Sequence, residues 1–220
     1  MPKPATRPPL IDPLRLDGLD AGDPDALAPQ RTVEGLRFVD VDAEGRDLSG
    51  ATFSECELVG WNAHETSFRA ARFLETRVER LNAPVFVASR STFRDVRIEG
   101  SRIGSAELYD AELQSLVVEQ SKLGWVNLRA AELRDVRFTG CSFDELDLGE
   151  AKLARVAFED CTVGELVVTR TTMQDVDLRG LDIRAIRSLE GLAGATIDSQ
   201  QAAALAEHFA AQLGLRIEDR

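Results

Sequence analysis

The chain has 220 residues, of which 44% are hydrophobic, and its 38 acidic and 26 basic residues give a formal net charge of −12 at pH 7. Such acidity argues against direct binding to nucleic acid, because that binding depends on Lys and Arg displacing counterions from phosphates. No apolar run is long enough to span a membrane, and Met1–Pro4 lacks the apolar region of a signal peptide. Three cysteines without C-x-x-C spacing favour reduced thiols. We therefore expect a cytoplasmic protein that binds neither nucleic acid nor membrane directly.

Residues 1–35 have the composition of an extended lead-in. Seven of the eight prolines lie within residues 1–29, and an Asp-rich stretch follows residue 19. Such a composition disfavours a packed core. We expect a partly extended segment that leucines fasten to the flank of the following domain, namely Leu10, Leu14, Leu16 and Leu19.

From residue 36 onward, apolar residues recur at every fifth position. Every residue whose number ends in 3 or 8 is apolar from Phe38 to Ile183, which is thirty positions without exception and includes eight of the ten phenylalanines. Residues whose numbers end in 1 or 6 form a second, smaller set in which only Arg46 is charged. Because alternate residues of a strand share a face, each unit places two side chains inward. Five residues are too few for a strand and its return, so each unit must form one side of a coil.

Two further patterns indicate that each coil has four sides. From Ala111 to Val176 the second inward position alternates between a small and a larger residue, and like residues stack only if each coil contains an even number of units. A coil made of four such units also brings glycines together at two corners, where turns with positive φ would require them. The first corner has Gly60, Gly100, Gly140 and Gly180, and the next has Gly104, Gly124 and Gly164.

These units resemble the pentapeptide-repeat family, whose consensus is close to A-[DN]-L-x-x. Matching stretches are Arg46-Asp-Leu-Ser-Gly50, Ala111-Glu-Leu-Gln-Ser115, Ala131-Glu-Leu-Arg-Asp135 and Ala151-Lys-Leu-Ala-Arg155. The resemblance covers residues 36–185 and implies an all-β solenoid, a right-handed four-sided parallel β-helix of about 7.5 coils. Arg46, Trp61 and Phe86 depart from the small residues that the family prefers at their positions. We also expect a local bulge near Leu81–Ala88, which contains Pro84.

Residues 186–220 are expected to form a C-terminal cap with a helix at about 199–213. Asp198-Ser-Gln-Gln201 has the pattern of a capping box, and Gly214 would end the helix. Leu205, Phe209 and Leu213 lie on one stripe of this helix. An open β-helix end exposes unpaired backbone and core, so a cap is required. The family's dimeric members imply that this region also forms a homodimer interface.

Groups able to perform catalysis are few. His64 and His208 have no cysteine or second histidine at ligand spacing, and the sequence contains neither a nucleophile elbow nor a phosphate-binding glycine loop. Cys141 and Cys161 should stack on adjacent rungs with parallel side chains, which favours buried thiols over a disulfide. The sequence therefore predicts no enzyme, no cofactor and no metal site.

Acidic residues recur at 20-residue steps in two ladders. The side ladder consists of Glu79, Glu99, Glu119 and Glu159, and the corner ladder consists of Glu55, Glu75, Asp95, Asp135 and Asp175. Such ladders could imitate phosphates, and the family resemblance implies this for relatives that occupy the DNA-binding surface of DNA gyrase. Arginines close to both ladders favour the competing interpretation, a self-neutralising surface. They are Arg77, Arg97 and Arg137 beside the side ladder, and Arg94 and Arg134 beside the corner ladder.

Apolar residues also occupy outward positions on three successive coils near one corner. This aromatic patch consists of Val85, Val87, Tyr109 and Trp125. Exposed aromatic residues suggest a partner site, although scattered apolar residues on a surface are ordinary. Two functions stay open: a non-catalytic protein-interaction scaffold with an unknown protein partner, or a DNA-mimicking modulator of DNA gyrase or another type II topoisomerase, as in quinolone resistance.

Overall fold

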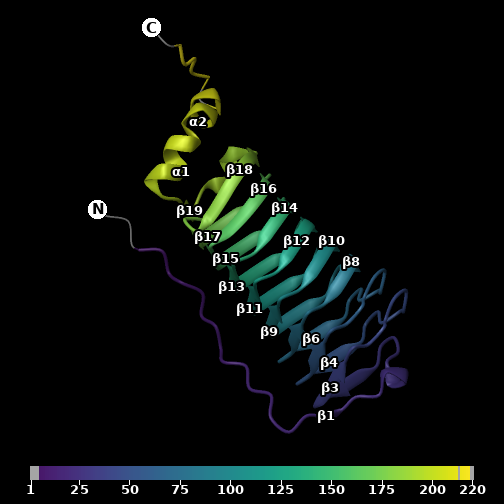
Figure 1. Cartoon of the computed structure of the whole chain (residues 1–220). Helices are drawn as coiled ribbons and strands as arrows, with labels where there is room; N and C mark the ends of the chain where they lie inside the picture. The colour runs from purple at the N-terminus through teal and green to yellow at the C-terminus, as the bar shows by residue number, and fades with distance from the viewer. Residues whose placement is uncertain (1–4, 213, 219–220) are drawn as a thin grey trace.

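A computed structural model describes residues 5–212 and 214–218. The chain winds into a parallel β-solenoid of about 9 turns, with short helices after its last turn (Figure 1). Residues on successive rungs pair 20 positions apart, as Phe93 does with Leu113 and Leu113 with Leu133. The predicted solenoid with four five-residue sides in each coil is therefore confirmed.

Within the described residues the strands form two parallel sheets, of 13 and 6 strands. The larger sheet contains β1 (Asp20–Ala21), β2 (Thr32–Glu34), β3 (Leu36–Val39), β4 (Thr52–Ser54), β5 (Glu57–Val59), β6 (Arg72–Leu74), β7 (Arg77–Glu79), β9 (Thr92–Glu99), β11 (Glu112–Glu119), β13 (Glu132–Thr139), β15 (Lys152–Glu159), β17 (Thr172–Asp177) and β19 (Ala195–Thr196). The smaller sheet contains β8 (Asn82–Val87), β10 (Arg102–Glu107), β12 (Lys122–Asn127), β14 (Ser142–Asp147), β16 (Cys161–Val167) and β18 (Leu181–Arg187).

Strand pairing extends beyond both ends of the five-residue pattern. At the first turn, Asp20 of β1 pairs with Leu36, a shorter separation than that of the regular rungs, and Leu27 and Val33 are buried. At the last turn, Ala195 of β19 pairs with Val176, again at less than a full coil. These end turns keep the backbone pairing but not the repeat length, which is why the solenoid has about 9 turns and not 7.5.

Glycines at the corners serve two different purposes. Gly60, Gly100 and Gly140 have positive φ, as predicted. The same prediction is wrong for Gly180 and for the second glycine corner, which adopt no positive φ. There the backbones of successive rungs approach so closely that a Cβ at Gly124 would lie 2.1 Å from the Gly104 carbonyl oxygen.

The prediction of a bulge near Leu81–Ala88 is wrong. β8 keeps the 20-residue register with β10, with Ala83 opposite Ile103 and Val85 opposite Ser105. Pro84 stands opposite Gly104, where a Cβ would lie 2.6 Å from the Pro84 carbonyl oxygen. The missing side chain of Gly104 thus lets the two backbones approach closely, as at Gly124, and Pro84 fits into an unbroken strand.

Aromatic side chains fill the first half of the core. Phe53, Phe73 and Phe93 stack on successive rungs, with ring centroids 5.2 and 4.8 Å apart. Trp61 is 1% exposed and meets Phe53 edge to face. Such aromatic pairs contribute about 0.5–1.5 kcal/mol each beyond the burial of area. A large residue at position 61 is therefore accommodated by the aromatic core.

The other two departures from the family pattern also have a structural place. The ring of Phe86 packs 5.4 Å from that of Phe68, inside the core. Arg46 lies at the N-terminal end of the solenoid, where its Nη1 donates to the carbonyl oxygen of Pro24, 3.0 Å away. Pro24–Ala26 form a short 3-10 helix that follows β1.

Two short helices follow the solenoid, α1 (Ser199–Ala204) and α2 (Ala206–Gln212), where one helix was expected. The predicted capping box is confirmed, because Gln201 N donates to the Asp198 carboxylate and the Gln201 side chain accepts from Asp198 N. The helices separate at Leu205, which is buried against the end of the solenoid. Gln201 Nε2 donates to the carbonyl oxygens of Leu178 and Leu181 and so fastens the cap to the last rungs. No helix in the described part of the chain is long and apolar enough to cross a membrane.

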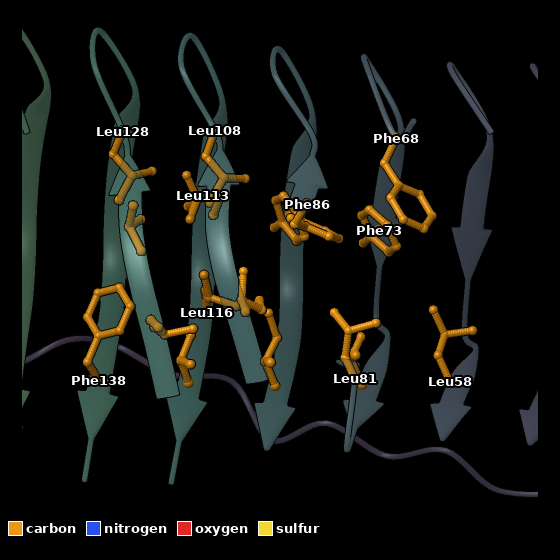
Figure 2. A pocket seen from close by; sticks show the side chains of 18 of the residues that line it. Leu58, Phe68, Phe73, Leu81, Phe86, Leu108, Leu113, Leu116, Leu128 and Phe138 are labelled. Carbon is orange, nitrogen blue, oxygen red and sulfur yellow. The ribbon is translucent and has the colours of Figure 1, made fainter. Parts of the chain in front are cut away.

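A cavity of about 70 Å³ interrupts the core where the aromatic residues give way to smaller ones (Figure 2). Its lining is apolar, and Ala106 contributes to it between Phe86 and Val126 of the neighbouring rungs. Ile98 and Leu108 line the same cavity and are only partly buried. Ala106 is the one alanine in its inward column, so its small side chain leaves space that larger residues fill on the neighbouring rungs.

We expect Ala106→Val to stabilise the solenoid by about 0.5–2 kcal/mol, because added methyl groups fill space that no other atom occupies. The matched control is Ala131→Val, at a fully buried position outside the cavity lining. Overpacking should make that change cost about 1–3 kcal/mol. Chemical denaturation of the variants measures the difference, and equal effects of the two changes would contradict a fillable cavity.

Candidate interaction surfaces

The corner ladder lies on a single column of residues whose backbone has the left-handed conformation. We call this the corner column; it comprises Glu55, Glu75, Asp95, Ser115, Asp135, Arg155 and Asp175, all with φ between 47° and 58°. Backbone pairing stacks these positions at 20-residue steps, as between β11, β13 and β15. The predicted acidic residues do share a corner, but a serine and an arginine interrupt them.

Asp135 is the most enclosed carboxylate of this column. Its two oxygens accept from Arg155 Nε at 2.5 Å and Arg155 Nη2 at 2.6 Å, and Oδ1 also accepts from Leu10 N at 2.9 Å. Burial opposes the ionisation of Asp135, but the Arg155 and Leu10 hydrogen bonds outweigh it and hold the pKa of Asp135 below its ordinary value. The corner column is therefore neutralised locally at this rung.

The N-terminal arm, residues 5–19, runs along the outside of the solenoid from its C-terminal end to its N-terminal end and contacts the corner column (Figure 1). Arg7 binds Asp175 through its backbone N–H at 3.2 Å and its Nε at 2.8 Å. Farther along, Asp12 N donates to Ser115 Oγ at 3.3 Å. The hydrogen bonds with Arg7 hold the pKa of Asp175 below its ordinary value. The arm thus covers the half of the corner column that carries Asp135 and Asp175.

Of the leucines expected to fasten this segment, Leu10 is 67% exposed, and Leu14, Leu16 and Leu19 are partly buried. Attachment at Leu10 comes from its backbone N–H and not from its side chain. Hydrogen bonds of this kind leave no periodic trace in the sequence, so the docking path of the arm could not be predicted.

The side ladder is also a true column. Glu79, Glu99 and Glu119 pair on successive rungs, then Thr139 takes the next place before Glu159. The arm reaches this column too, since a groove is lined by Pro13 and Leu14 together with Arg77, Glu79, Arg97, Glu99 and Glu119.

The arginines beside the side ladder bind elsewhere. Arg77 forms an ion pair with Glu57 at 3.5 Å, one rung away, and not with Glu79. Arg97 donates to the carbonyl oxygens of Ser115 and Asp12. Burial, together with the like charges of neighbouring arginines, lowers the pKa of Arg97. Stacked rungs lie about 4.8 Å apart, closer than two alternate residues of one strand, so opposite charges pair along the column.

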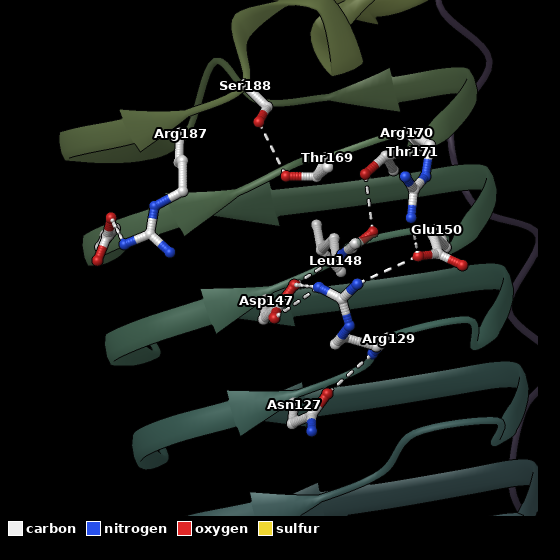
Figure 3. A network of polar contacts seen from close by, with 12 residues as sticks. Asn127, Arg129, Asp147, Leu148, Glu150, Thr169, Arg170, Thr171, Arg187 and Ser188 are labelled. Carbon is white, nitrogen blue, oxygen red and sulfur yellow. Dashed lines mark hydrogen bonds and ion pairs between the residues drawn. The ribbon is translucent and has the colours of Figure 1, made fainter.

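Opposite charges one coil apart recur as ion pairs at several places on the surface. Glu132 pairs with Lys152 at 2.7 Å, and Arg37 pairs with Glu57 at the same distance. Arg129, Asp147, Glu150 and Arg170 form a larger polar network across three rungs (Figure 3). Most of these pairs could be predicted from the sequence, because residues of opposite charge stand about one coil apart in it.

Val85, Val87 and Trp125 of the aromatic patch lie on the smaller sheet, at the corner diagonally opposite the corner column, and Tyr109 lies in the turn after β10. Val85, Ser105 and Trp125 occupy one column on β8, β10 and β12. Trp125 is 61% exposed, whereas Val85, Val87 and Tyr109 are partly buried. Among the described residues, the structure places no aromatic ring in contact with Trp125 or Tyr109, so these side chains share a region but form no compact cluster.

The predicted cysteine column is present and reduced. Cys141 and Cys161 are buried on adjacent rungs, and Cys141 N lies 3.4 Å from Cys161 Sγ. A hydrogen bond with Cys161 and burial raise the pKa of the Cys141 thiol. His64 is partly buried with Nε2 4.0 Å from a Glu65 oxygen, and His208 is exposed on α2. Within residues 5–212 and 214–218, no cluster of His, Cys, Asp and Glu could hold a metal ion.

The predicted C-terminal stripe is partly covered. Leu205 is buried, and Phe209 lines a shallow pocket with Leu192 and Ile197 near the end of the solenoid. Leu213 lies outside the described residues. Beyond α2, Leu215 and Ile217 are 62% and 60% exposed.

A family comparison agrees with this geometry: the model of the pentapeptide repeat region matches residues 91–167. Residues 91–167 of the solenoid therefore have a pentapeptide-repeat sequence. The match covers the part in which the smaller sheet and the eight-residue strands are most regular. Comparison with curated protein sequences gives no match.

Among solved structures, this chain is similar to QnrB1 and to HetL, a pentapeptide repeat protein. Full-length QnrB1, a plasmid-mediated fluoroquinolone resistance protein, is 19% identical over 86% of this chain and 94% of its own, with a TM-score of 0.33. HetL, involved in heterocyst differentiation regulation in the cyanobacterium Nostoc sp. strain PCC 7120, is 16% identical over 78% of this chain and 91% of its own, with a TM-score of 0.28.

Acid should release the N-terminal arm from the wall of the solenoid. The pKa values of Asp135 and Asp175 are held below the ordinary 3.8, so their stabilising effect is complete above that pH and is lost as the pH falls through the lowered values. We expect the NMR signal of the Leu10 amide to move toward its position in a free peptide over this acidic range. The Lys122 amide, which donates to Ser101 O inside the solenoid wall, serves as the control. An unchanged Leu10 signal after both carboxylates are protonated would contradict this account.

Proposed function

We propose that this chain is a non-catalytic protein-interaction scaffold that presents fixed columns of side chains to a protein partner. The observation that carries the proposal is Trp125, which is 61% exposed although it sits in the middle of a regular sheet. Tryptophan is enriched at the centres of protein interfaces, because it buries a large area at a small cost in conformational entropy. A large exposed aromatic side chain on a rigid strand is suited to that role.

The neighbouring side chains support a contact surface of moderate size around Trp125. Val85 lies two rungs away in the same column, with Ser105 between them. On the other side Trp125 pairs with Glu145, so the aromatic patch is bordered by charge. An apolar centre with a polar rim is the ordinary arrangement of a protein interface. We place the scaffold in the cytoplasm, without a cofactor, and propose a homodimer through the C-terminal region.

Replacing the aromatic side chains should abolish capture of the partner. When the intact chain is used to capture proteins from its native lysate, Trp125→Ala/Tyr109→Ala should weaken binding of a specific partner at least about tenfold, because interface centres dominate binding. Val39→Ala is the matched control, since Val39 is 49% exposed at the other end of the solenoid. Equal recovery of the same partner by both variants would refute the assignment to the aromatic patch.

The second candidate is a DNA-mimicking modulator of DNA gyrase or another type II topoisomerase. One observation favours it, the continuous stack of Glu79, Glu99 and Glu119, in which only Glu79 has an ion pair among the described residues. Two observations weigh against it. Asp135 and Asp175 are paired with arginines, and the N-terminal arm passes beside the side ladder. The scaffold is therefore the better-supported function.

A supercoiling assay separates the two functions. A DNA mimic should inhibit gyrase, or protect it from a fluoroquinolone, at micromolar protein, and Glu99→Lys/Glu119→Lys should remove the effect by reversing the charge that imitates phosphate. Glu218→Lys, in the exposed C-terminal segment, is the control for net charge. No effect of the wild-type chain, or a strictly monomeric chain, would exclude the DNA mimic.

A further inference from the structure

The N-terminal arm is held by the corner column as an extended peptide is held by a receptor. The contacts are the Arg7 guanidinium and backbone N–H on Asp175, the Leu10 N–H on Asp135, and the Asp12 N–H on Ser115. The Asp12 carbonyl oxygen in turn accepts from Arg97 Nη2. One side chain and four backbone groups of the arm therefore make its contacts with the corner column and Arg97.

The spacing of these contacts matches a proline-rich strand to the rungs of the solenoid. Arg7 and Leu10 are three residues apart and bind carboxylates that are two rungs apart. A polyproline II chain advances about 9.3 Å in three residues, at about 3.1 Å per residue. Two rungs at about 4.8 Å span about 9.6 Å. One turn of polyproline II therefore matches the two rungs between Asp175 and Asp135, and the next contact, from Asp12 N–H to Ser115, lies two residues and one rung farther.

The prolines of the arm occur at positions where no backbone N–H is needed for a hydrogen bond to the corner column. Pro8 and Pro9 fall between the two donating residues, and Pro13 follows Asp12. A proline restricts both itself and the residue before it to extended conformations, so the arm loses little conformational freedom on docking. Its apolar side chains contribute little, since none of residues 5–19 is buried. The corner column thus recognises a backbone pattern and one arginine.

We propose that the corner column from Ser115 to Asp175, with Arg97, is a recognition site for an extended proline-containing segment of a partner protein, and that the chain's own arm occupies it in the absence of that partner. The fitting segment has an arginine, then two residues that need no N–H, then a residue with a free N–H. This proposal rests on the scaffold function and names a second class of contact for it, at the corner diagonally opposite Trp125.

Two properties of the docked arm bear on its exchange with such a segment. The Arg7 side chain is 62% exposed in its ion pair with Asp175, and exposed pairs of this kind hold weakly. The covalent link nevertheless gives the arm an effective concentration on the order of millimolar, so it shields the corner column from weak competitors. A partner segment must therefore bind more tightly than the arm, or the arm must first be released.

The test uses the full chain and a fluorescent peptide with the sequence of residues 5–17. In the arm-release variant, Arg7→Glu/Leu10→Pro, the first change places a carboxylate against Asp175 and the second removes the N–H that binds Asp135. Both changes lie outside the solenoid wall. We expect the peptide to bind this variant at least about tenfold more tightly than the wild-type chain, because the competing arm is gone. Arg15→Glu, a matched charge change in the exposed part of the arm, should leave peptide binding at the wild-type level.

A second pair of variants locates the binding on the corner column. Asp175→Asn in the arm-release chain should abolish peptide binding, and asparagine tolerates the left-handed backbone at this position. Asp95→Asn, in the same column and with the same φ region, should leave it intact. Peptide binding unaffected by Asp175→Asn, or absent from a folded arm-release chain, would overturn the proposal.

Exchange of arms between two copies is a separate outcome. If the wild-type chain forms dimers that the arm-release changes abolish, the occupant is the arm of a second copy and the partner segment is refuted. Peptide binding that persists in Trp125→Ala/Tyr109→Ala separates the corner column from the aromatic patch. Failure of partner capture at the patch would then refute the scaffold assignment and leave the proposal for the corner column intact.

Discussion

Hydrogen bonding between successive rungs is the constraint from which the other features of the solenoid follow. Each rung must present its backbone groups opposite those of the next, so the chain has to return to the same place after every four units. This is possible only if it turns sharply at the end of each unit, and at three of the corners it does so with positive φ on nearly every coil. Nineteen of the residues from Gln30 to Asp175 with positive φ are not glycines. A left-handed conformation costs about 1–2 kcal/mol per residue, and it is kept because the corner N–H groups, such as that of Glu75 on Arg94 O at 2.9 Å, are bonded to the next rung.

Rung pairing also decides what the acidic composition means. Because side chains in one column are closer than alternate side chains along a strand, several carboxylates form ion pairs with a cation one coil away. Asp135 with Arg155, and Glu132 with Lys152, are pairs of this kind. The net charge of −12 is a sum over the whole chain. On the sides of the solenoid, opposite charges face each other along several columns and neutralise each other locally. The stack from Glu79 to Glu119 departs from this rule and keeps its charges of one sign together.

The sequence was most informative where side chains repeat with the rungs. The thirty apolar positions, the stacked cysteines and the capping box at Asp198 could all be predicted, because each depends on local spacing. The first and last turns could not be predicted. Their paired residues are less than a full coil apart, so they break the five-residue period although the backbone still pairs. Gly104 and Gly124 looked like turn residues, but the reason for glycine there is the approach of another rung. The path of the arm depends on backbone donors, which every residue except proline possesses.

The boundary between the arm and the solenoid is physical and lies near Gly22. At this glycine a Cβ would lie 2.4 Å from the ring of Phe38, so the backbone is packed directly on the core. From there the chain continues through a 3-10 helix to Leu27, which is buried at 6% exposure and closes the N-terminal end. Before Gly22 the chain adds hydrogen bonds to the outside of the wall and no buried side chain among residues 5–19. Loss of the arm would therefore expose the corner column without opening the core, which is the property that an exchangeable occupant of a rigid surface requires.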